Sequence, residues 1–407
     1  MIGNGFQPVI LEIMTALKDL VNQPTFDSQI HLRLIYGNGQ VTRVGELAAE
    51  YGASKVLLVT DPGIRSAGHV DKVSESLDSA KLKVFIYDQA KENPTTKCVT
   101  DCAELAKAQQ IDFIIGLGGG SSMDTAKGCN FILTNGGEMK DYWGVGKASK
   151  PMLPLIAIPT TAGTGSECQS FALISDAVTH AKMACGDPKA MAKVAILDPE
   201  LTLSQPPRVT ACTGIDAVAH AVESAVTRKR NETSQQYSKF AFGLLSESFP
   251  ALLKNPENIA ARGRMLLGAA FAGTAIEHSM LGAAHSAANP LTAHFNVIHG
   301  QAVGMMLPHV VRFNGKDKIT AEAYADLING TAICADNGSV SHELLAQTLE
   351  SMMDEAQLPR ALVDCGVKSD KLEELSEEAA GQWTASFNPR DIAAADFLEL
   401  YQKALGS

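Results

Sequence analysis

The sequence predicts an N-terminal α/β domain built on a parallel sheet, followed by an all-helical C-terminal domain. Three observations predict this class. Short apolar runs alternate with helical patterns in the first half of the chain. A glycine-rich segment joins one of these runs to a helix. After about residue 206 the chain is rich in Ala, Leu, Glu, Met and Gln, and β-branched runs become rare.

Four apolar runs are the expected strands of the first domain, and each ends at a turn residue or at glycines. They are Val56–Thr60, Val84–Tyr87, Ile111–Leu117 and Leu155–Ile158. Helical patterns lie between them, as at residues 100–109. Continuous apolar strands separated by helices indicate a parallel sheet that is covered on both faces.

Two adjacent prolines, Pro206 and Pro207, mark the expected domain junction, because proline interrupts helices and strands. The first domain is then residues 1–205, with a helical extension over residues 1 to about 28, and the second is residues 206–407. A length of 407 residues agrees with two domains of roughly 100–200 residues each. We expect a ligand-binding cleft between them, since such clefts are common binding sites.

The composition narrows the class of protein. Hydrophobic residues make up 45%, charged residues 19%, and the net charge is −11. These are globular proportions, and an acidic surface repels phosphate backbones, so nucleic acid is not an expected partner. No stretch approaches the ~20 apolar residues of a membrane span, and the N-terminus lacks the basic segment of a signal peptide. The eight cysteines form no C-x-x-C pair, which predicts reduced thiols in the cytoplasm.

The clearest binding motif is the segment Ile114–Lys127, in which an apolar run passes through three glycines into a helix. Glycines let the backbone approach a pyrophosphate, and a helix N-terminus favours an anion. The alternative is a strand-to-helix turn without a ligand, because the pattern is neither G-x-G-x-x-G nor a P-loop.

Two further polar features follow strands. The loop Pro159–Glu167 contains threonines and glycines that suit phosphates and sugars, although the same pattern is typical of a helix N-cap. Asp61 follows the first strand, where a carboxylate can accept hydrogen bonds from ribose hydroxyls and repel a 2′-phosphate. Asp61 therefore predicts NAD over NADP if a dinucleotide binds, and the alternative is a turn aspartate before proline.

A second constellation suits a metal ion. Asp216 and His220 are four residues apart and share a helix face among small apolar neighbours. His285 lies among alanines, and His299 precedes Gly300. Asp216 could simply pair with His220, and a buried histidine is often a satisfied core residue. Because burial without partners is costly, the four together suit a first-row divalent ion such as Fe(II) or Zn(II).

Together these motifs resemble the iron-containing (group III) alcohol dehydrogenase family, within the dehydroquinate-synthase-like fold. The matching pieces run in the family's order over roughly residues 30 to 400. They are Gly118-Gly119-Gly120-Ser121 with Asp124 and Lys127, Pro159–Thr164 with Ser166-Glu167, Asp198-Pro199, Gly214–Ala217 with His220-Ala221 and Glu223, His285, and His299-Gly300.

The resemblance implies a Rossmann-like dinucleotide-binding domain and a helical catalytic domain. The implied activity is a metal-dependent, NAD(H)-linked alcohol dehydrogenase or aldehyde reductase that transfers hydride between nicotinamide C4 and a small primary alcohol or aldehyde, in a homodimer. The implied metal ligands are Asp216, His220, His285 and His299. The implied cofactor contacts are Asp61, Asn93, Gly119, Gly120, Ser121, Asp124, Thr160, Thr161, Thr164 and Lys182.

The chain departs from the family pattern at Asn289, where members often carry a second histidine four residues after the third ligand. That histidine is often taken to assist proton transfer, and asparagine cannot titrate. Either His294 replaces it, or water and the cofactor ribose carry the proton.

Two alternative functions remain at this point. The first is a lyase or cyclase of the dehydroquinate-synthase type, which shares the fold and cofactor. Such enzymes hold a phosphate-bearing substrate with basic residues, and residues 278–308 contain no Lys or Arg. The second is a nucleotide-binding homologue without catalysis, which would have no need of four intact candidate ligands.

Overall fold

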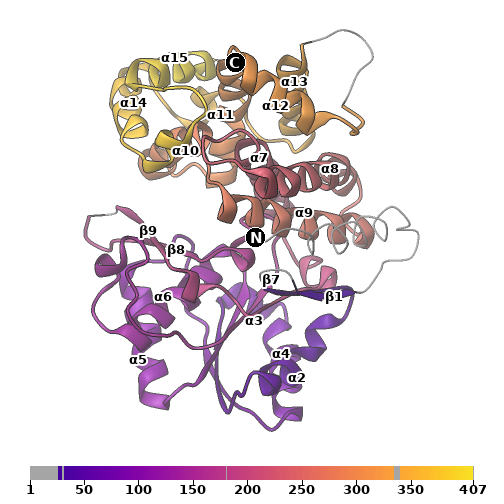
Figure 1. The fold of residues 1–407 in the computed structure, drawn as a ribbon, viewed down its shortest axis with the longest axis vertical. Helices are drawn as coiled ribbons and strands as arrows, with labels where there is room; N and C mark the ends of the chain where they lie inside the picture. Colours follow the sequence, from indigo (N-terminus) through magenta and orange to yellow (C-terminus); the bar gives the residue numbers. More distant parts are fainter. Residues whose placement is uncertain (1–25, 30–31, 180, 334–339, 407) are drawn as a thin grey trace. The chain divides into compact units, whose positions relative to one another are not determined.

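The computed structural model describes residues 26–29, 32–179, 181–333 and 340–406. The chain forms two compact units (Figure 1). The first lies within residues 1–161 and 166–204, and the second comprises residues 162–165 and 205–407. The short segment Ala162–Gly165 therefore belongs with the helical unit, although it lies between residues of the first unit in the sequence.

A seven-stranded sheet forms the centre of the first unit. Its strand order is β1-β2-β10-β7-β5-β3-β4, with β1 antiparallel to β2 and all other neighbours parallel. The strands are β1 (Phe26–Gln29), β2 (Arg33–Tyr36), β3 (Lys55–Val59), β4 (Lys83–Tyr87), β5 (Phe113–Gly118), β7 (Leu155–Pro159) and β10 (Val194–Leu197). The predicted parallel sheet is confirmed, and the four predicted runs are β3, β4, β5 and β7.

Successive side chains of these strands enter hydrophobic layers on opposite faces of the sheet. On β3, Val56 and Leu58 enter one layer, whereas Leu57 and Val59 enter the other. The first layer is closed by α2 (Val44–Glu50) and α4 (His69–Ser79), and the second by α5 (Thr96–Gln109) and α6 (Gly120–Asn135). Burial on both faces explains why the strands read as continuous apolar runs.

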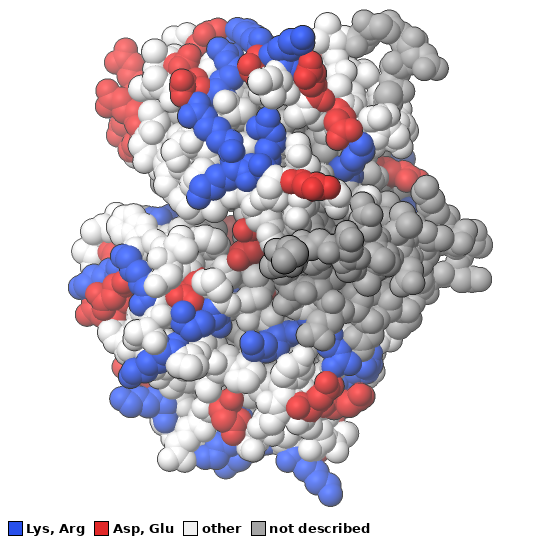
Figure 2. All heavy atoms as spheres, viewed as in Figure 1, with Lys and Arg blue, Asp and Glu red and all other residues white. Residues whose placement is uncertain are grey.

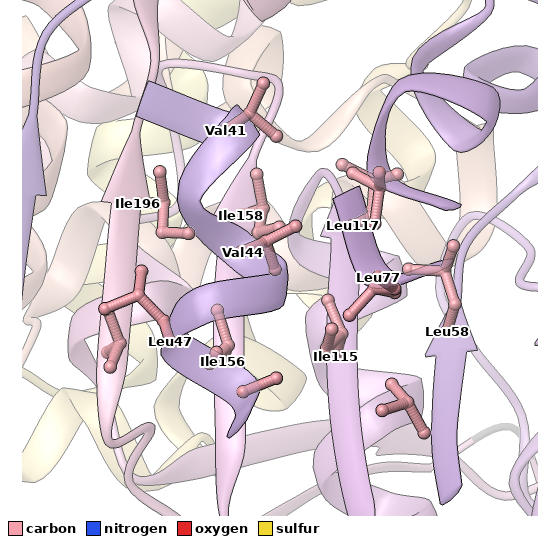
Figure 3. Packing of buried hydrophobic residues seen from close by; sticks show 14 of the residues in the cluster. Val41, Val44, Leu47, Leu58, Leu77, Ile115, Leu117, Ile156, Ile158 and Ile196 are labelled. Atoms are coloured by element: carbon pink, nitrogen blue, oxygen red, sulfur yellow. The ribbon is translucent and has the colours of Figure 1, made fainter. Parts of the chain in front are cut away.

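Figure 3 shows part of the first layer, where Val44 and Leu47 of α2 lie over the isoleucines of β7 and β10. A short helix, α3 (Pro62–Ser66), follows β3 directly. The parallel strands all end at the same edge of the sheet, so the loops that follow them are brought together there.

A small second sheet completes the first unit. It consists of β6 (Gly144–Val145), β9 (Lys182–Gly186) and β8 (Phe171–Ser175), in that spatial order. Strand β8 packs against α6. None of its three strands is among the four predicted from the sequence.

The regular elements of the second unit are all helical in its described part, which confirms the predicted helical domain. They are α7 (Pro207–Ser224), α8 (Glu232–Lys254), α9 (Ile259–His278), α10 (Ala283–Phe295), α11 (His299–Asn314), α12 (Lys318–Ile328), α13 (Ser341–Glu355), α14 (Leu372–Ala380) and α15 (Ala394–Leu405). Helix α7 packs against α8, α9 and α11. It is therefore buried on most sides, as its run of small apolar residues requires.

The predicted N-terminal helical extension is partly wrong. Most of it, residues 1–25, lies outside the described residues, but residues 26–28 belong to β1. These residues pair antiparallel with β2.

The charges at the surface, the cysteines and the length of the helices can also be compared with the expectations from the sequence. In Figure 2, positive and negative side chains are interspersed on the visible face of each unit. The described cysteines are free thiols, and Cys334 lies outside the described residues. Across the described helices, none combines the length and apolar character needed to cross a membrane.

Candidate metal centre and cofactor cradle

Helix α7 carries three polar side chains on one buried face. Asp216, His220 and Glu223 follow one another at four and three residues, which places them on one side of a helix. Their exposed fractions are 5%, 5% and 4%. The Asp216 Oδ1 atom lies 3.6 Å from His220 Nε2, which is too long for a hydrogen bond. The two side chains therefore do not satisfy each other, as the alternative of a simple pair would require.

The first turn of α10 brings His285 to the same face. Its Nε2 atom lies 3.5 Å from Asp216 Oδ1. Its ring stacks on that of His220, with centroids 4.9 Å apart and planes inclined by 19°. The candidate ligand atoms of Asp216, His220 and His285 lie within 4.8 Å of one another, although the residues are up to 69 positions apart in the sequence.

The fourth predicted ligand, His299, is the first residue of α11 and stands beside this group. Its ring centroid is 5.4 Å from that of His285. The next residue must be glycine, because a Cβ on Gly300 would lie 2.0 Å from the Cys212 carbonyl oxygen and 3.1 Å from Asp216 Cβ. The missing side chain therefore lets the start of α11 approach α7 closely enough to bring His299 to the site.

The polar atoms at the centre of this group fit a cation. Among the described residues, Asp216 Oδ1 and His285 Nε2, which lie 3.5 Å apart, are buried and have no hydrogen-bond partner. His220 turns its Nε2 atom toward Asp216, and its other ring nitrogen is also buried without a partner. Each such atom costs free energy when it is left unsatisfied. A divalent ion would be coordinated by carboxylate oxygen and imidazole nitrogen, which are ordinary ligands of first-row metals.

The charges around the site also favour a cation. Burial alone would raise the pKa of Asp216, but His220, His285 and His299 hold it well below its ordinary value. Burial would lower the pKa of His285, but the carboxylates of Asp216 and Glu223 raise it to about 9. Two buried carboxylates therefore attract positive charge to this point.

Glu223 has a contact role that the sequence analysis did not assign. Its Oε2 atom lies 2.5 Å from His285 Nδ1, and its Oε1 accepts a hydrogen bond from the Ala284 backbone N–H at 2.7 Å. In the sequence, the feature that pointed to Glu223 as part of the site was its position seven residues after Asp216 on the same buried helix face. Its partner could not be identified from the sequence, because His285 is 62 residues away.

Neither Asn289 nor His294 supplies a titratable group beside the three candidate ligands on α7 and α10. Asn289 donates a hydrogen bond to Gln382 Oε1 at 3.0 Å. His294 Nε2 lies 2.9 Å from both carboxylate oxygens of Glu378 at the surface. It is nine residues after His285, about 14 Å along a helix. These positions argue against His294 as the replacement and leave water and the cofactor ribose.

The glycine segment forms a cradle at the edge of the large sheet. Strand β5 ends at Gly118, which has φ of 144° and where a Cβ would lie 2.5 Å from Ser122 Oγ. Helix α6 begins at Gly120 after the extended residue Gly119. The first N–H groups of a helix lack intrahelical acceptors, so those of Gly120 and Ser121 are of the kind that can bind an anion.

Asp61 has the turn role that was the alternative for its sequence position, and it also lies next to the glycine segment. Its Oδ1 atom caps α3 by accepting hydrogen bonds from the backbone N–H groups of Gly63 and Ile64, at 2.8 and 3.0 Å. Its Oδ2 atom faces the cradle, 3.4 Å from Ser122 Oγ. A Cβ on Gly118 would lie 3.3 Å from this oxygen. The carboxylate thus stabilises a helix start and borders the anion cradle at the same time.

Other predicted cofactor contacts follow the neighbouring strands. Thr160 and Thr161 follow β7, and the Thr160 N–H binds the Gly118 carbonyl at 3.0 Å. The Thr160 hydroxyl is buried and has no hydrogen-bond partner in the described chain. Asn93 is exposed in the loop after β4 and has φ of 51°. Thr164 belongs to the segment that groups with the helical unit.

Asp124 lies in a buried network instead of on the surface of the cradle. It accepts a hydrogen bond from Ser166 Oγ at 3.0 Å. Burial raises the pKa of Asp124, although Lys127, Ser166 and Lys182 act in the opposite direction. Lys182, at the start of β9, is exposed. Of the two predicted cofactor contacts Asp124 and Lys182, only Lys182 has an exposed side chain that a cofactor bound to the first unit could reach.

The fold and these two sites define a class of protein. A parallel sheet carries an anion cradle with a bordering carboxylate, and a helical unit carries a buried carboxylate–imidazole group. This combination is that of a metal-dependent dehydrogenase that uses a dinucleotide.

Comparisons with known proteins identify the family. The model of the iron-containing alcohol dehydrogenases matches residues 32–199, and that of the C-terminal part of the Fe-containing alcohol dehydrogenase family matches residues 210–405. The chain is 33% identical to an NAD-dependent methanol dehydrogenase of Bacillus methanolicus over 91% of this chain and 97% of that protein. It is 30% identical to a lactaldehyde reductase of Escherichia coli (strain K12), again over 91% and 97%.

A solved structure of an alcohol dehydrogenase from Oenococcus oeni superimposes with a TM-score of 0.87 at 28% identity, covering 94% of this chain and all of that one. The chain belongs to the iron-containing alcohol dehydrogenase family. It is therefore an oxidoreductase of the kind that acts on CH–OH donors, as the sequence analysis predicted. The names of these relatives favour oxidoreduction over the dehydroquinate-synthase alternative.

Proposed function

We propose that this enzyme is a metal-dependent, NAD(H)-linked alcohol dehydrogenase that interconverts a small primary alcohol and its aldehyde. One observation carries the proposal: Asp216, His220 and His285 converge from two helices. In the described residues, Asp216 Oδ1 and His285 Nε2 are buried there, 3.5 Å apart, without hydrogen-bond partners. The printed names of the relatives, a methanol dehydrogenase and a lactaldehyde reductase, support small alcohols and aldehydes as the substrate class.

The proposed metal ligands are Asp216, His220, His285 and His299. One carboxylate and three imidazoles suit several divalent ions, and the family description favours Fe(II) over Zn(II) as the resident ion. When bound, the ion supplies Lewis acidity toward the substrate oxygen, and NAD supplies the hydride acceptor. The protein's own residues hold the ion in a site from which most bulk water is excluded by burial.

The proposed cofactor site lies at the edge of the sheet where β3, β4, β5 and β7 end. The backbone of Gly119, Gly120 and Ser121 binds the pyrophosphate, and Asp61 Oδ2 accepts from the adenosine ribose. Asn93, Thr160, Thr161, Thr164 and Lys182 complete the contacts, whereas we propose that Asp124 acts indirectly through the buried network with Ser166.

Two properties of the whole protein are also proposals. A homodimer follows from the family resemblance. A cytoplasmic location agrees with the free thiols of the described residues, because such thiols persist in a reducing compartment.

The function is tested by steady-state kinetics on a panel of small alcohols and aldehydes, read by NADH absorbance. A chelator is used to remove the metal, and Fe(II), Zn(II) or Mg(II) is then added back. We expect turnover to disappear on chelation and to return with Fe(II), and not with Mg(II), which prefers oxygen ligands. Turnover that survives complete removal of metal would contradict the proposal.

The charge of Asp61 should set the choice between NAD and NADP. The Asp61→Asn variant keeps an acceptor for the cap of α3 but removes the negative charge that repels a 2′-phosphate. We expect the ratio of kcat/KM for NAD over that for NADP to fall about fivefold or more, since unit charges ~4 Å apart interact by ~1 kcal/mol in bulk water and ~4 kcal/mol near a protein surface. The control is Asp71→Asn, which changes an exposed aspartate on α4 and should leave the ratio as it is.

A further inference from the structure

We infer that Glu223 is a positioning residue that fixes the ring and the tautomer of His285, so that His285 presents the Nε2 lone pair to the metal. This inference rests on the proposed metal centre. It assigns a function to a carboxylate that is outside the proposed ligand set and is 4% exposed.

The two oxygens of Glu223 have different partners on adjacent residues of α10. Oε2 lies 2.5 Å from His285 Nδ1, and Oε1 accepts from the Ala284 backbone N–H at 2.7 Å. Helix α10 begins after Gly282, which provides no side-chain cap. Glu223 therefore satisfies an N–H group of the first turn and places its charge at the positive end of the helix.

The surroundings of Glu223 hold it in this position. A Cβ on Gly282 would lie 3.1 Å from Glu223 Oε1 and 3.3 Å from Asn388 Oδ1. Asn388 in turn exchanges two hydrogen bonds with Asn314, at 3.0 and 2.8 Å. The glycine therefore makes room for the carboxylate, and the Asn388 amide, which is held by Asn314, lies beside the same glycine.

The contact between Glu223 and His285 determines which ring nitrogen of His285 carries a proton. When Glu223 Oε2 accepts the hydrogen bond of this contact, the donor proton is fixed on His285 Nδ1. Nε2 is then the ring nitrogen that is left to bind a metal ion. Nε2 is the atom that lies 3.5 Å from Asp216 Oδ1. Such a partner on the far nitrogen of a ligating histidine orients the ring and increases its basicity toward the metal.

A purely structural role is the competing explanation, because Glu223 also stabilises the start of α10. Two substitutions separate the roles. Glu223→Gln keeps the size but has one accepting oxygen and one donating amide. If the oxygen stays on the Ala284 N–H, the amide faces His285 Nδ1 and favours the tautomer with the proton on Nε2, which blocks metal binding. Glu223→Ala removes both contacts and leaves space for water.

The matched control is Ser286→Ala, on the residue after His285. The Ser286 hydroxyl binds the Gly282 carbonyl at 3.0 Å and the Thr384 hydroxyl at 2.7 Å. This change therefore weakens the same helix start without touching the His285 ring.

The experiment measures two quantities on the full-length chain: Zn(II) affinity by competition with a chromophoric chelator, and the melting temperature of the metal-free protein. We expect Zn(II) binding to weaken about 10–100-fold in both Glu223 variants, with Glu223→Gln affected at least as strongly as Glu223→Ala. We expect Ser286→Ala to lower the melting temperature and to keep the wild-type affinity.

The outcomes also separate this inference from the proposed function. If His285→Ala loses Zn(II) while both Glu223 variants bind it like the wild type, Glu223 is a structural residue and the inference is wrong. If His285→Ala itself binds Zn(II) like the wild type, the proposed metal centre fails. The inference would also be wrong if Zn(II) affinity fell in proportion to the melting temperature in all three variants, including Ser286→Ala.

Discussion

The His285→Ala variant should lose both its metal and its activity. His285 offers one of three buried candidate ligand atoms that lie within 4.8 Å of one another, and alanine provides no replacement. A bound metal stabilises a transition state by several kcal/mol. At about 1.4 kcal/mol per factor of ten, we expect kcat/KM for alcohol oxidation to fall by roughly a thousandfold or more. Metal content is measured by elemental analysis of the purified protein.

The control for this variant is His294→Ala, on the same helix. His294 is exposed and pairs with Glu378, so its removal should change neither the metal content nor kcat/KM. A His285→Ala protein with normal metal and normal turnover would reject His285 as a ligand. A His294→Ala protein that loses activity would restore the relay through His294 that the positions argue against.

The second large effect should come from Lys127→Met, and it concerns stability. The Lys127 side chain is fully buried in α6. Its ammonium group donates to the carbonyl oxygens of Ser166, Gln169 and Phe171, at 2.6, 2.7 and 3.0 Å, and to the Ser166 hydroxyl. Methionine fills the space but leaves these acceptors without their donor. Breaking a buried charged network costs about 3–5 kcal/mol, so we expect the midpoint of urea unfolding to fall clearly.

The control is Lys107→Met, on an exposed lysine of α5. It should change the free energy of unfolding by no more than about 0.5 kcal/mol. Equal stability of the Lys127→Met protein and the wild type would show that the network around the segment from Ser166 to Phe171 is not held by the ammonium group.

The parallel sheet could be predicted because its central strands are buried on both faces. That burial makes β3, β5 and β7 continuous apolar runs, and their ends are marked by Asp61, Gly118 and Pro159. The strands that were missed are short or lack this pattern. Strand β2 is four residues that begin with Arg33, and β9 (Lys182–Gly186) contains no β-branched residue.

The convergence of Asp216, His220 and His285 could be predicted because buried polar residues are conspicuous among alanines and because the motifs resemble one family. The spacing of Asp216 and His220 fixes their common helix face. The approach of α11 depends on Gly300, whose contact with the Cys212 carbonyl is visible only in three dimensions. The sequence could not assign Glu223, since its contact with His285 depends on how α10 begins.

The network around Lys127 shows a second limit of the sequence. The family resemblance implies a cofactor contact for Asp124, and Lys127 belongs to the same motif after the glycine segment. In the structure, the Lys127 ammonium group binds three carbonyl groups about 40 residues further along the chain. A side chain on the first turns of a helix can therefore stabilise a neighbouring loop instead of binding a ligand.

Anomalous diffraction from crystals of the metal-loaded enzyme, recorded at the iron or zinc edge, tests the central claim most directly. We predict one strong peak at about 2 Å from atoms of Asp216, His220, His285 and His299. A peak only at the exposed group of His294, Glu374 and Glu378, which also brings three candidate ligands together, would contradict the account. The account would also be contradicted if crystals with stoichiometric metal showed no peak shared by the four side chains of the predicted centre.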